Sequence, residues 1–145
     1  MKPIIKWSGG KQDEIKYFKK YIPNYEVYLE PFFGGGSVFF DIKPKKAIIG
    51  DIHPELIKFY CAMKEGRRED IHAFMSLHPN EEKTYYEVRD LPESAERFYY
   101  LRKTCYRGML RYNKSGEFNI PFGRYKKINY SDLLNPYYES IFSNT

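Results

Sequence analysis

The sequence predicts an α/β fold that opens with a strand, a glycine turn, a helix and a second strand. The segments Val27–Leu29 and Ala47–Ile49 are short apolar runs, and between them lie Gly34–Gly36 and a helical pattern from Ser37 to Asp41. This order is the start of a βαβ unit, in which the strands are parallel and the crossover is right-handed. A third observation is the loss of helical periodicity from Arg111 to Lys127, which predicts a β-hairpin carrying basic residues.

Helices fill most of the remaining chain. Apolar residues recur at helical spacing over Gln12–Ile22, from Pro54 to Met63, and over Glu69–Leu77, Glu82–Arg89 and Glu93–Arg107. Pro23 ends the first of these helices, and Pro54 is placed to begin the second. Within the basic hairpin, Asn113 to Gly116 has the composition of a turn.

The composition indicates one globular domain. The chain has 145 residues, of which 42% are hydrophobic and 19% aromatic, and this excludes an intrinsically disordered protein. There is no apolar run long enough to span a membrane and no signal-peptide pattern, so we expect a cytoplasmic protein. Cys61 and Cys105 are the only cysteines and lack C-x-x-C spacing, so we expect two core thiols and no metal site.

Positive charge is concentrated in one segment. Arg97–Lys127 contains nine cations and one acid, Glu117, which gives +8 against −3 for the rest of the chain. Such a segment attracts polyanions, and the aromatic residues interleaved with it are able to stack on or insert between bases. Nucleic acid is therefore the leading partner. The alternative is that these aromatic side chains form core and the cations a solvated face.

The glycine turn and the following acid predict a nucleoside site. Glycines at the end of a strand let the backbone approach a ligand closely, and Asp51, which follows the second strand, is placed to accept hydrogen bonds from ribose hydroxyls. Phe39 stands where the dinucleotide fingerprint has its third glycine, which favours a nucleoside without a pyrophosphate. The alternative is a simple tight turn.

The segment Lys6–Lys11 is not a phosphate-binding P-loop. Gln12 replaces the magnesium-binding Ser or Thr, and the upstream glycine of that motif is missing, which argues against a kinase or ATPase. An indole and two cations around a flexible Gly-Gly link could cover a small ligand and hold its carboxylate. A buried tryptophan beside a tight turn is the alternative.

Four segments, taken in their order along the chain, resemble the Dam-type adenine-specific DNA methyltransferases. The resemblance covers nearly the whole chain, to about Lys127, and corresponds to the amino-terminal part of that family. The segments are Lys6-Trp7-Ser8-Gly9-Gly10-Lys11, Glu30-Pro31-Phe32-Phe33-Gly34-Gly35-Gly36-Ser37, Gly50-Asp51-Ile52-His53, and Arg111-Tyr112-Asn113 with Phe118 to Lys126. The resemblance implies a partial Rossmann-like methyltransferase sheet that uses S-adenosylmethionine, with an inserted helical target-recognition region and a basic β-hairpin. The implied divisions are a donor-binding half (1–53), a DNA-recognition region (54–127) and a tail (128–145).

The resemblance also assigns residues to the methyl donor. Trp7 and Lys11 would lie against it, Asp51 would bind its ribose, and the segment from Pro31 to Gly36 would wrap it. The implied cofactor-binding set is Trp7, Lys11, Pro31, Phe32, Gly34, Gly36 and Asp51.

In relatives the hairpin enters double-stranded DNA to read a short site, often GATC. Arg111 resembles the arginine that reads guanine, since a guanidinium engages O6 and N7 together. Arg107 stands where the family commonly has Asn. The implied DNA-binding set is Tyr106, which inserts into the duplex, Arg107, Met109 and Pro121 near thymine methyl groups, Arg111, Asn113, and Arg124 and Lys126 on phosphates.

No catalytic residue is identified in this chain. The family's Asp-Pro-Pro-Tyr motif is absent, and Asn135-Pro136-Tyr137-Tyr138 lacks both its carboxylate and its second proline, so an ordinary turn is expected there. Only two good strands are found, and exposed apolar strand faces would favour self-association or a complementing carboxy-terminal polypeptide. We therefore expect a truncated or split adenine methyltransferase of bacterial, phage or viral origin. A non-catalytic DNA-binding module and a generic nucleoside-binding protein are the alternatives.

Overall fold

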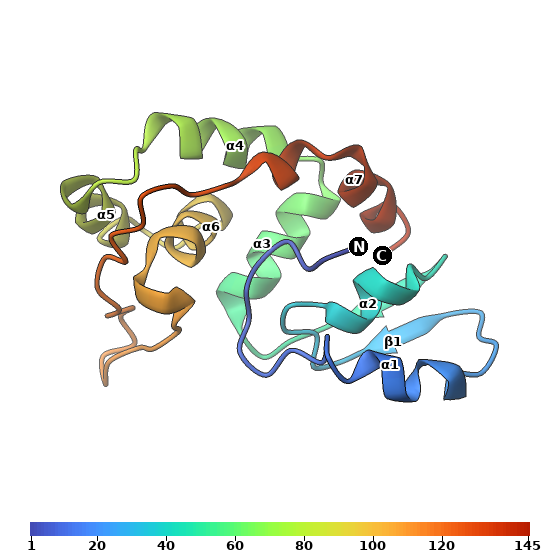
Figure 1. The fold of residues 1–145 in the computed structure, drawn as a ribbon. Coiled ribbons are helices and arrows are strands. Elements are labelled where there is room, and N and C mark those ends of the chain that lie inside the picture. The colour runs from blue at the N-terminus through green and yellow to red at the C-terminus, as the bar shows by residue number, and fades with distance from the viewer.

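The computed structural model describes residues 1–145 and has a small sheet region beside a larger helical region (Figure 1). The sheet region contains the N-terminal segment, α1, β1, α2 and β2, and the helical region contains α3 to α6. In chain order the elements are α1 (Ile15–Phe18), the 3-10 turn η1 (Lys19–Tyr21), β1 (Tyr28–Glu30), α2 (Ser37–Ile42), β2 (Ala47–Ile49), α3 (Pro54–Lys64), α4 (Arg68–Leu77), α5 (Glu82–Arg89), α6 (Ala95–Thr104), η2 (Tyr106–Gly108), η3 (Ser131–Leu134) and α7 (Pro136–Phe142).

The predicted βαβ unit is confirmed. Strands β1 and β2 pair in parallel, with Leu29 opposite Ile48, and α2 connects them. The second strand has the predicted bounds, whereas the first begins one residue later than expected. The sheet contains these two strands alone, so the finding is a mixed α/β fold with a small parallel sheet. Leu29 and Ile48 are 64% and 60% exposed, so one face of the sheet is uncovered.

The helix prediction was best for α5, which has the predicted bounds Glu82–Arg89, and for α4, which begins one residue earlier than expected. Helix α3 starts at Pro54, and α6 starts after Ser94, whose hydroxyl accepts a hydrogen bond from Arg97 N. The prediction of Glu93–Arg107 for α6 was too long at both ends, because the helix begins at Ala95 and the chain leaves it after Thr104. The first helix is also shorter than predicted. In place of Gln12–Ile22, the structure has the four-residue helix α1 followed by the 3-10 turn η1.

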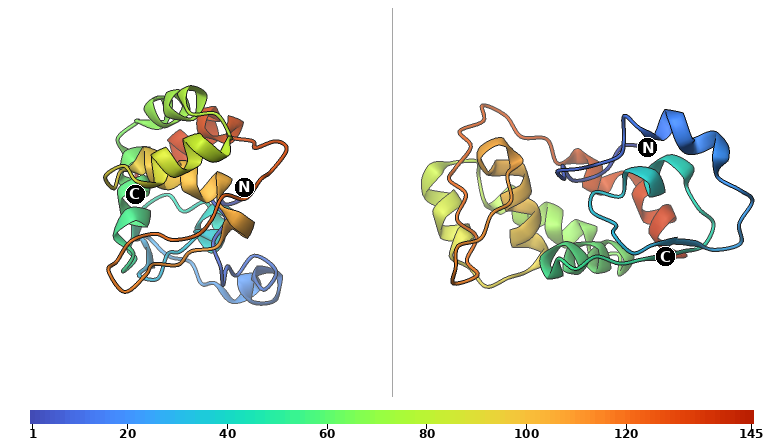
Figure 2. Two further views of the ribbon diagram at one scale, coloured as in Figure 1. Left: turned by 90° about the vertical axis from the view of Figure 1, so that its left-hand side faces the viewer. Right: turned by 90° about the horizontal axis from the view of Figure 1, so that it is seen from below.

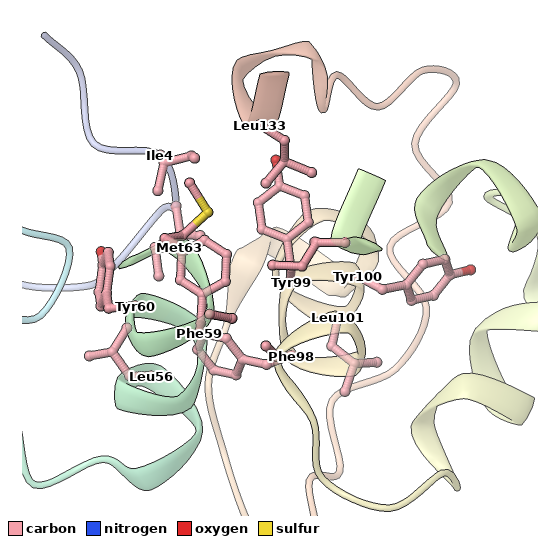
Figure 3. Close-up of a cluster of buried hydrophobic side chains, with 14 of the residues drawn as sticks. Ile4, Leu56, Phe59, Tyr60, Met63, Phe98, Tyr99, Tyr100, Leu101 and Leu133 are labelled. Carbon is pink, nitrogen blue, oxygen red and sulfur yellow. The ribbon is translucent and has the colours of Figure 1, made fainter. Parts of the chain in front are cut away.

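The core lies where α3 crosses α6 (Figure 3). Phe59 of α3 stacks on Tyr99 of α6, with ring centroids 5.5 Å apart and planes inclined by 12°. Ile4 from the N-terminal segment and Leu133 from η3 pack on the same cluster. The N-terminal and C-terminal segments therefore both contribute to one continuous core.

The segment Asn135–Tyr138 starts a helix and is not an isolated turn. The Asn135 side chain accepts a hydrogen bond from Tyr137 N and caps α7. Tyr138 is buried and donates its hydroxyl to the carbonyl of Lys2, which brings the two ends of the chain together (Figure 1). These residues therefore have a structural role.

The predicted hairpin is present only as an irregular loop. The turn from Asn113 to Gly116 is confirmed, since Gly116 N donates to the Asn113 carbonyl. Regular strands are absent, and two isolated antiparallel bridges hold the loop, Tyr112 with Phe118 and Cys105 with Phe122. The basic loop, which we define as residues 105–127, lies at the end of the molecule far from α1 (Figure 2).

Two smaller expectations were also tested. Cys105 is buried as expected, whereas the prediction of a core thiol at Cys61 was wrong, because this residue lies on the exposed side of α3. None of the helices has the length and apolar character required to cross a membrane.

Candidate functional site

Three segments that are distant in sequence surround a cavity of about 320 Å³ at the carboxyl ends of the two strands. They are the N-terminal stretch from Trp7 to Lys11, the glycine turn after β1, and Asp51 after β2. Six of the seven predicted cofactor residues line this cavity, namely Trp7, Lys11, Phe32, Gly34, Gly36 and Asp51. Pro31 is outside its lining.

The glycine turn is shaped first by the protein's own aromatic rings. Gly34 has φ of +52°, and a Cβ there would stand 2.8 Å from Cδ1 of Trp7. Gly36 has φ of +69°, and its Cβ would stand 2.4 Å from Cζ of Phe33. Both glycines are therefore required by backbone conformation and by close packing of rings. The tight turn that was the alternative is therefore present, and the same glycines form part of the cavity wall.

Asp51 fixes the glycine turn in place. Its Oδ2 accepts a hydrogen bond from Gly34 N at 2.8 Å, and its Oδ1 accepts one from His53 N at 3.0 Å. An ionised carboxylate has about four acceptor positions, so both oxygens retain capacity for further donors. Asp51 is thus oriented by the backbone while its carboxylate remains part of the cavity wall.

Glu30 is a cavity residue that the sequence analysis missed. It ends β1, lines the same cavity, and accepts a hydrogen bond from the Tyr28 hydroxyl at 2.8 Å. Burial raises the pKa of Glu30, and the Tyr28 bond partly offsets this. The signal was available, because Glu30 ends its strand much as Asp51 follows the other. The cavity therefore carries two carboxyl groups.

Behind the basic loop lies a buried polar cluster that no sequence signal indicated. Arg97 Nη1 and Glu55 Oε1 are 2.6 Å apart, and the Tyr112 hydroxyl donates to Glu55 Oε2 at 2.5 Å. Arg97 also donates to the carbonyl of Arg89 at the end of α5. The cluster joins α3, α6 and the basic loop.

Arg102 is a second buried cation and has no acidic partner. Its guanidinium donates to the carbonyls of Gly108 and Met109 and lies between the rings of Phe98 and Phe118. Burial lowers its pKa. Two of the nine cations of the basic segment, Arg97 and Arg102, are therefore buried and do not contribute to the positive surface. Several aromatic side chains of the segment, such as Phe98 and Tyr99, lie in the core, as the alternative interpretation expected.

The eight predicted DNA-binding residues are all exposed on the basic loop. Arg111 donates from Nε to Oδ1 of Asn119 at 2.9 Å, which leaves both terminal nitrogens free of partners within the chain. Arg124 pairs with Glu82 at 2.6 Å. The guanidinium of Arg107 lies 5.2 Å from the ring centroid of Tyr106. The remaining members of the exposed set are Met109, Asn113, Pro121 and Lys126.

Residues 7–144 match the family model of the D12 class N6 adenine-specific DNA methyltransferases. The chain belongs to this methyltransferase family. The match continues well past Lys127, where the sequence resemblance was expected to stop, and includes α7.

Individual DNA methyltransferases are also similar to this chain, with identities between about a third and a half. The chain is 50% identical over its full length to the type II methyltransferase M.CviBI of Paramecium bursaria Chlorella virus NC1A, covering 59% of that protein. It is 38% identical over 134 residues to the DNA adenine methylase of Escherichia coli K12, covering 86% of this chain and 48% of that protein. It is 36% identical to the type II methyltransferase M.MjaIII of Methanocaldococcus jannaschii, covering 56% of that protein. The chain therefore spans about half to three-fifths of these relatives' length.

Proposed function

We propose that this chain supplies the donor-binding and DNA-recognition part of an adenine-specific DNA methyltransferase that transfers a methyl group from S-adenosylmethionine to the exocyclic amino group of adenine. The observation that supports this most strongly is the cavity where Trp7, the glycine turn and Asp51 meet. Residues 1–53 are assigned to the donor and 54–127 to DNA recognition. The segment 128–145 closes the fold through α7.

The chemistry of the cavity fits the donor. Its size is at the lower end of the range of ligand pockets, about 300–1,000 Å³. Asp51 would accept the ribose hydroxyls and Lys11 would hold the carboxylate of the methionine part. Glu30 would accept from its ammonium group, and Trp7 offers a π face near a cationic sulfonium. When bound, the donor supplies an electrophilic methyl group.

The basic loop would bind duplex DNA. Asn119 holds Arg111 by its Nε and leaves two terminal N–H groups, the geometry that pairs with guanine O6 and N7. Exposed Met109 and Pro121 provide apolar contacts, and Arg124 and Lys126 provide phosphate contacts. The Arg124–Glu82 pair would open as Arg124 moves to a phosphate.

Methyl transfer requires a group that grips the flipped adenine, and the chain contains no Asp-Pro-Pro-Tyr. We therefore propose that a complementing polypeptide, equivalent to the part of the relatives that this chain does not cover, provides it. A complementation assay distinguishes this proposal from the alternative of a non-catalytic module that keeps the donor and DNA sites.

The test combines two variants with a complementation assay. Asp51→Asn should weaken S-adenosylmethionine binding in calorimetry, because a charge-assisted acceptor is lost, whereas Asp70→Asn on exposed α4 should not. Arg111→Ala should cost about 1–3 kcal/mol of DNA affinity at one base pair, whereas Lys114→Ala at the turn should weaken all sequences alike. Unfolding curves for each variant show whether the fold is retained.

Complementation separates the candidates. Labelled methyl transfer should occur only when the uncovered carboxy-terminal part of a relative such as M.CviBI is added to this chain. Binding of donor and DNA without transfer in that mixture would favour the non-catalytic module. Donor binding with no effect of Arg111→Ala on DNA would favour the generic nucleoside-binding protein.

A further inference from the structure

The ring of His53 lies between the candidate donor cavity and the basic loop. On one side it meets Trp7 edge-on, with centroids 5.4 Å apart and planes at 84°. On the other side its centroid is 5.6 Å from that of Tyr112. Phe98 of α6 closes a third side at 5.9 Å. His53 is thus in aromatic contact with a residue of each site.

The backbone and one ring nitrogen hold His53 in this position. The backbone N–H of His53 donates to Asp51 Oδ1 at 3.0 Å, so the carboxylate assigned to the ribose also orients His53. Its Nδ1 accepts from Leu56 N at 3.3 Å and caps α3. The ring therefore sits on the first turn of a helix that belongs to the core, and it has little freedom to move independently of Asp51.

Tyr112 is restrained as firmly on the loop side. Its hydroxyl donates to Glu55, which the guanidinium of Arg97 holds in turn. Tyr112 lies in the chain between Arg111 and Asn113 and bridges to Phe118. A displacement of the basic loop by DNA must consequently move the Tyr112 ring or break this buried cluster, and either change reaches His53.

We propose that His53 is a positioning residue that couples donor binding at Trp7 and Asp51 to DNA binding by the basic loop. The inference rests on the proposed function of these two sites. When the basic loop binds DNA, Tyr112 packs more closely against His53. His53 then holds Trp7 and Asp51 in the arrangement that binds the donor. Because such coupling is reciprocal, the donor strengthens DNA binding by the same factor.

The coupling factor is the quantity to measure. Calorimetry gives the Kd of S-adenosylmethionine with and without a saturating duplex that contains GATC, and anisotropy of the labelled duplex gives the reciprocal measurement. Couplings between sites are typically about 5–150-fold. We expect at least a fivefold tightening of donor affinity by the duplex in the unmodified chain.

His53→Asn is the informative variant, because the shorter side chain retains an N-cap acceptor but loses all three ring contacts. Its melting temperature should fall, because the ring contacts with Trp7 and Phe98 are lost, but the variant should still fold and bind each ligand separately, while the coupling factor falls to about one. His72→Asn is the matched control. It removes the tilted ring contact of His72 with Tyr130, outside both sites, and should keep the full coupling.

The outcomes separate this inference from the proposed function. If the unmodified chain binds neither donor nor duplex, the proposed function fails and the coupling with it. If both ligands bind but independently, or if His53→Asn retains the coupling of the unmodified chain, the role of His53 is overturned and the proposed function stands.

Discussion

Glu55 and Arg97 form an ion pair almost wholly inside the protein, with side chains only 3% and 8% exposed. A buried pair adds little net stability compared with apolar residues, but the loss of one partner leaves the other charge unpaired in a medium of low dielectric constant. Glu55 also accepts the Tyr112 hydroxyl, and burial together with this bond raises the pKa of Tyr112. The cluster therefore depends on one carboxylate.

We predict that Glu55→Gln lowers the free energy of unfolding by about 3–5 kcal/mol, because Arg97 stays buried without a counter-charge. Urea denaturation measures this directly. Glu93→Gln is the control, since Glu93 pairs with Lys58 on the surface and such pairs contribute about 0–1 kcal/mol. Equal losses in the two variants would contradict the assignment of Glu55 as the buried partner.

At the level of single residues, the sequence predicted the glycine turn better than it predicted which charged side chains are buried. The glycines and Asp51 could be placed together, because strand ends and glycine turns have local signatures, whereas Trp7 was joined to them only by the family resemblance. Nothing local distinguishes Arg97 and Arg102, which are buried, from the exposed Arg107 in the same basic segment. Burial of Arg97 depends on Glu55, which is distant in sequence, and burial of Arg102 depends on the way the chain turns back after Thr104 and brings the carbonyls of Gly108 and Met109 to the guanidinium.

Among the elements, α3 connects the donor cavity to the core, and its first turn depends on His53. The ring nitrogen that accepts from Leu56 N must be unprotonated to do so. Burial lowers the pKa of His53, although the nearby Glu55 and Asp51 raise it in part and Arg102 and Glu93 act more weakly in opposite directions. The neutral imidazole is thus the form that the folded protein favours.

This shift predicts a pH dependence of stability with a defined sign. Above the ordinary histidine pKa of about 6.5, the ring is neutral in both states and the cap is intact. As pH falls below that value, the unfolded chain takes up a proton that the folded protein resists, so the free energy of unfolding decreases until the lower folded pKa is reached. Denaturation at a series of pH values should show this loss, and His53→Asn should reduce it. An unchanged pH profile in that variant would assign the effect to other groups.

The same scale explains which elements the sequence predicted. The apolar pattern alone predicted the bounds of α5, which has no side-chain cap, and Pro54 marked the start of α3. The start of α6 was predicted two residues before Ala95, because the cap at Ser94 was not recognised. The regular hairpin predicted for Arg111–Lys127 does not form, although the composition is that of a hairpin, because some of its backbone groups are not available for pairing between strands. The carbonyl of Ile120 accepts from the Tyr85 hydroxyl and from Arg89, and Pro121 has no N–H, so a regular ladder does not form there.

For the molecule as a whole, the most conspicuous feature is the uncovered face of the sheet. Leu29 and Ile48 are direct neighbours in the parallel register, and both are more than half exposed. Parallel sheets are almost always covered on both faces, because their strands carry apolar side chains in both directions. The presence of only two good strands in the sequence predicted this exposure, and the register shows that Leu29 and Ile48 are the exposed side chains.

We therefore predict that the chain self-associates through this face when no other polypeptide covers it. Sedimentation over a range of concentrations should show a rising average mass, and the double variant Leu29→Lys and Ile48→Lys should shift the chain toward monomer, since paired like charges repel each other and resist burial. Leu77→Lys is the control, because Leu77 is an exposed apolar residue at the end of α4 and lies outside the sheet. A monomer at all concentrations, or equal effects of the sheet and control variants, would show that this face does not drive association.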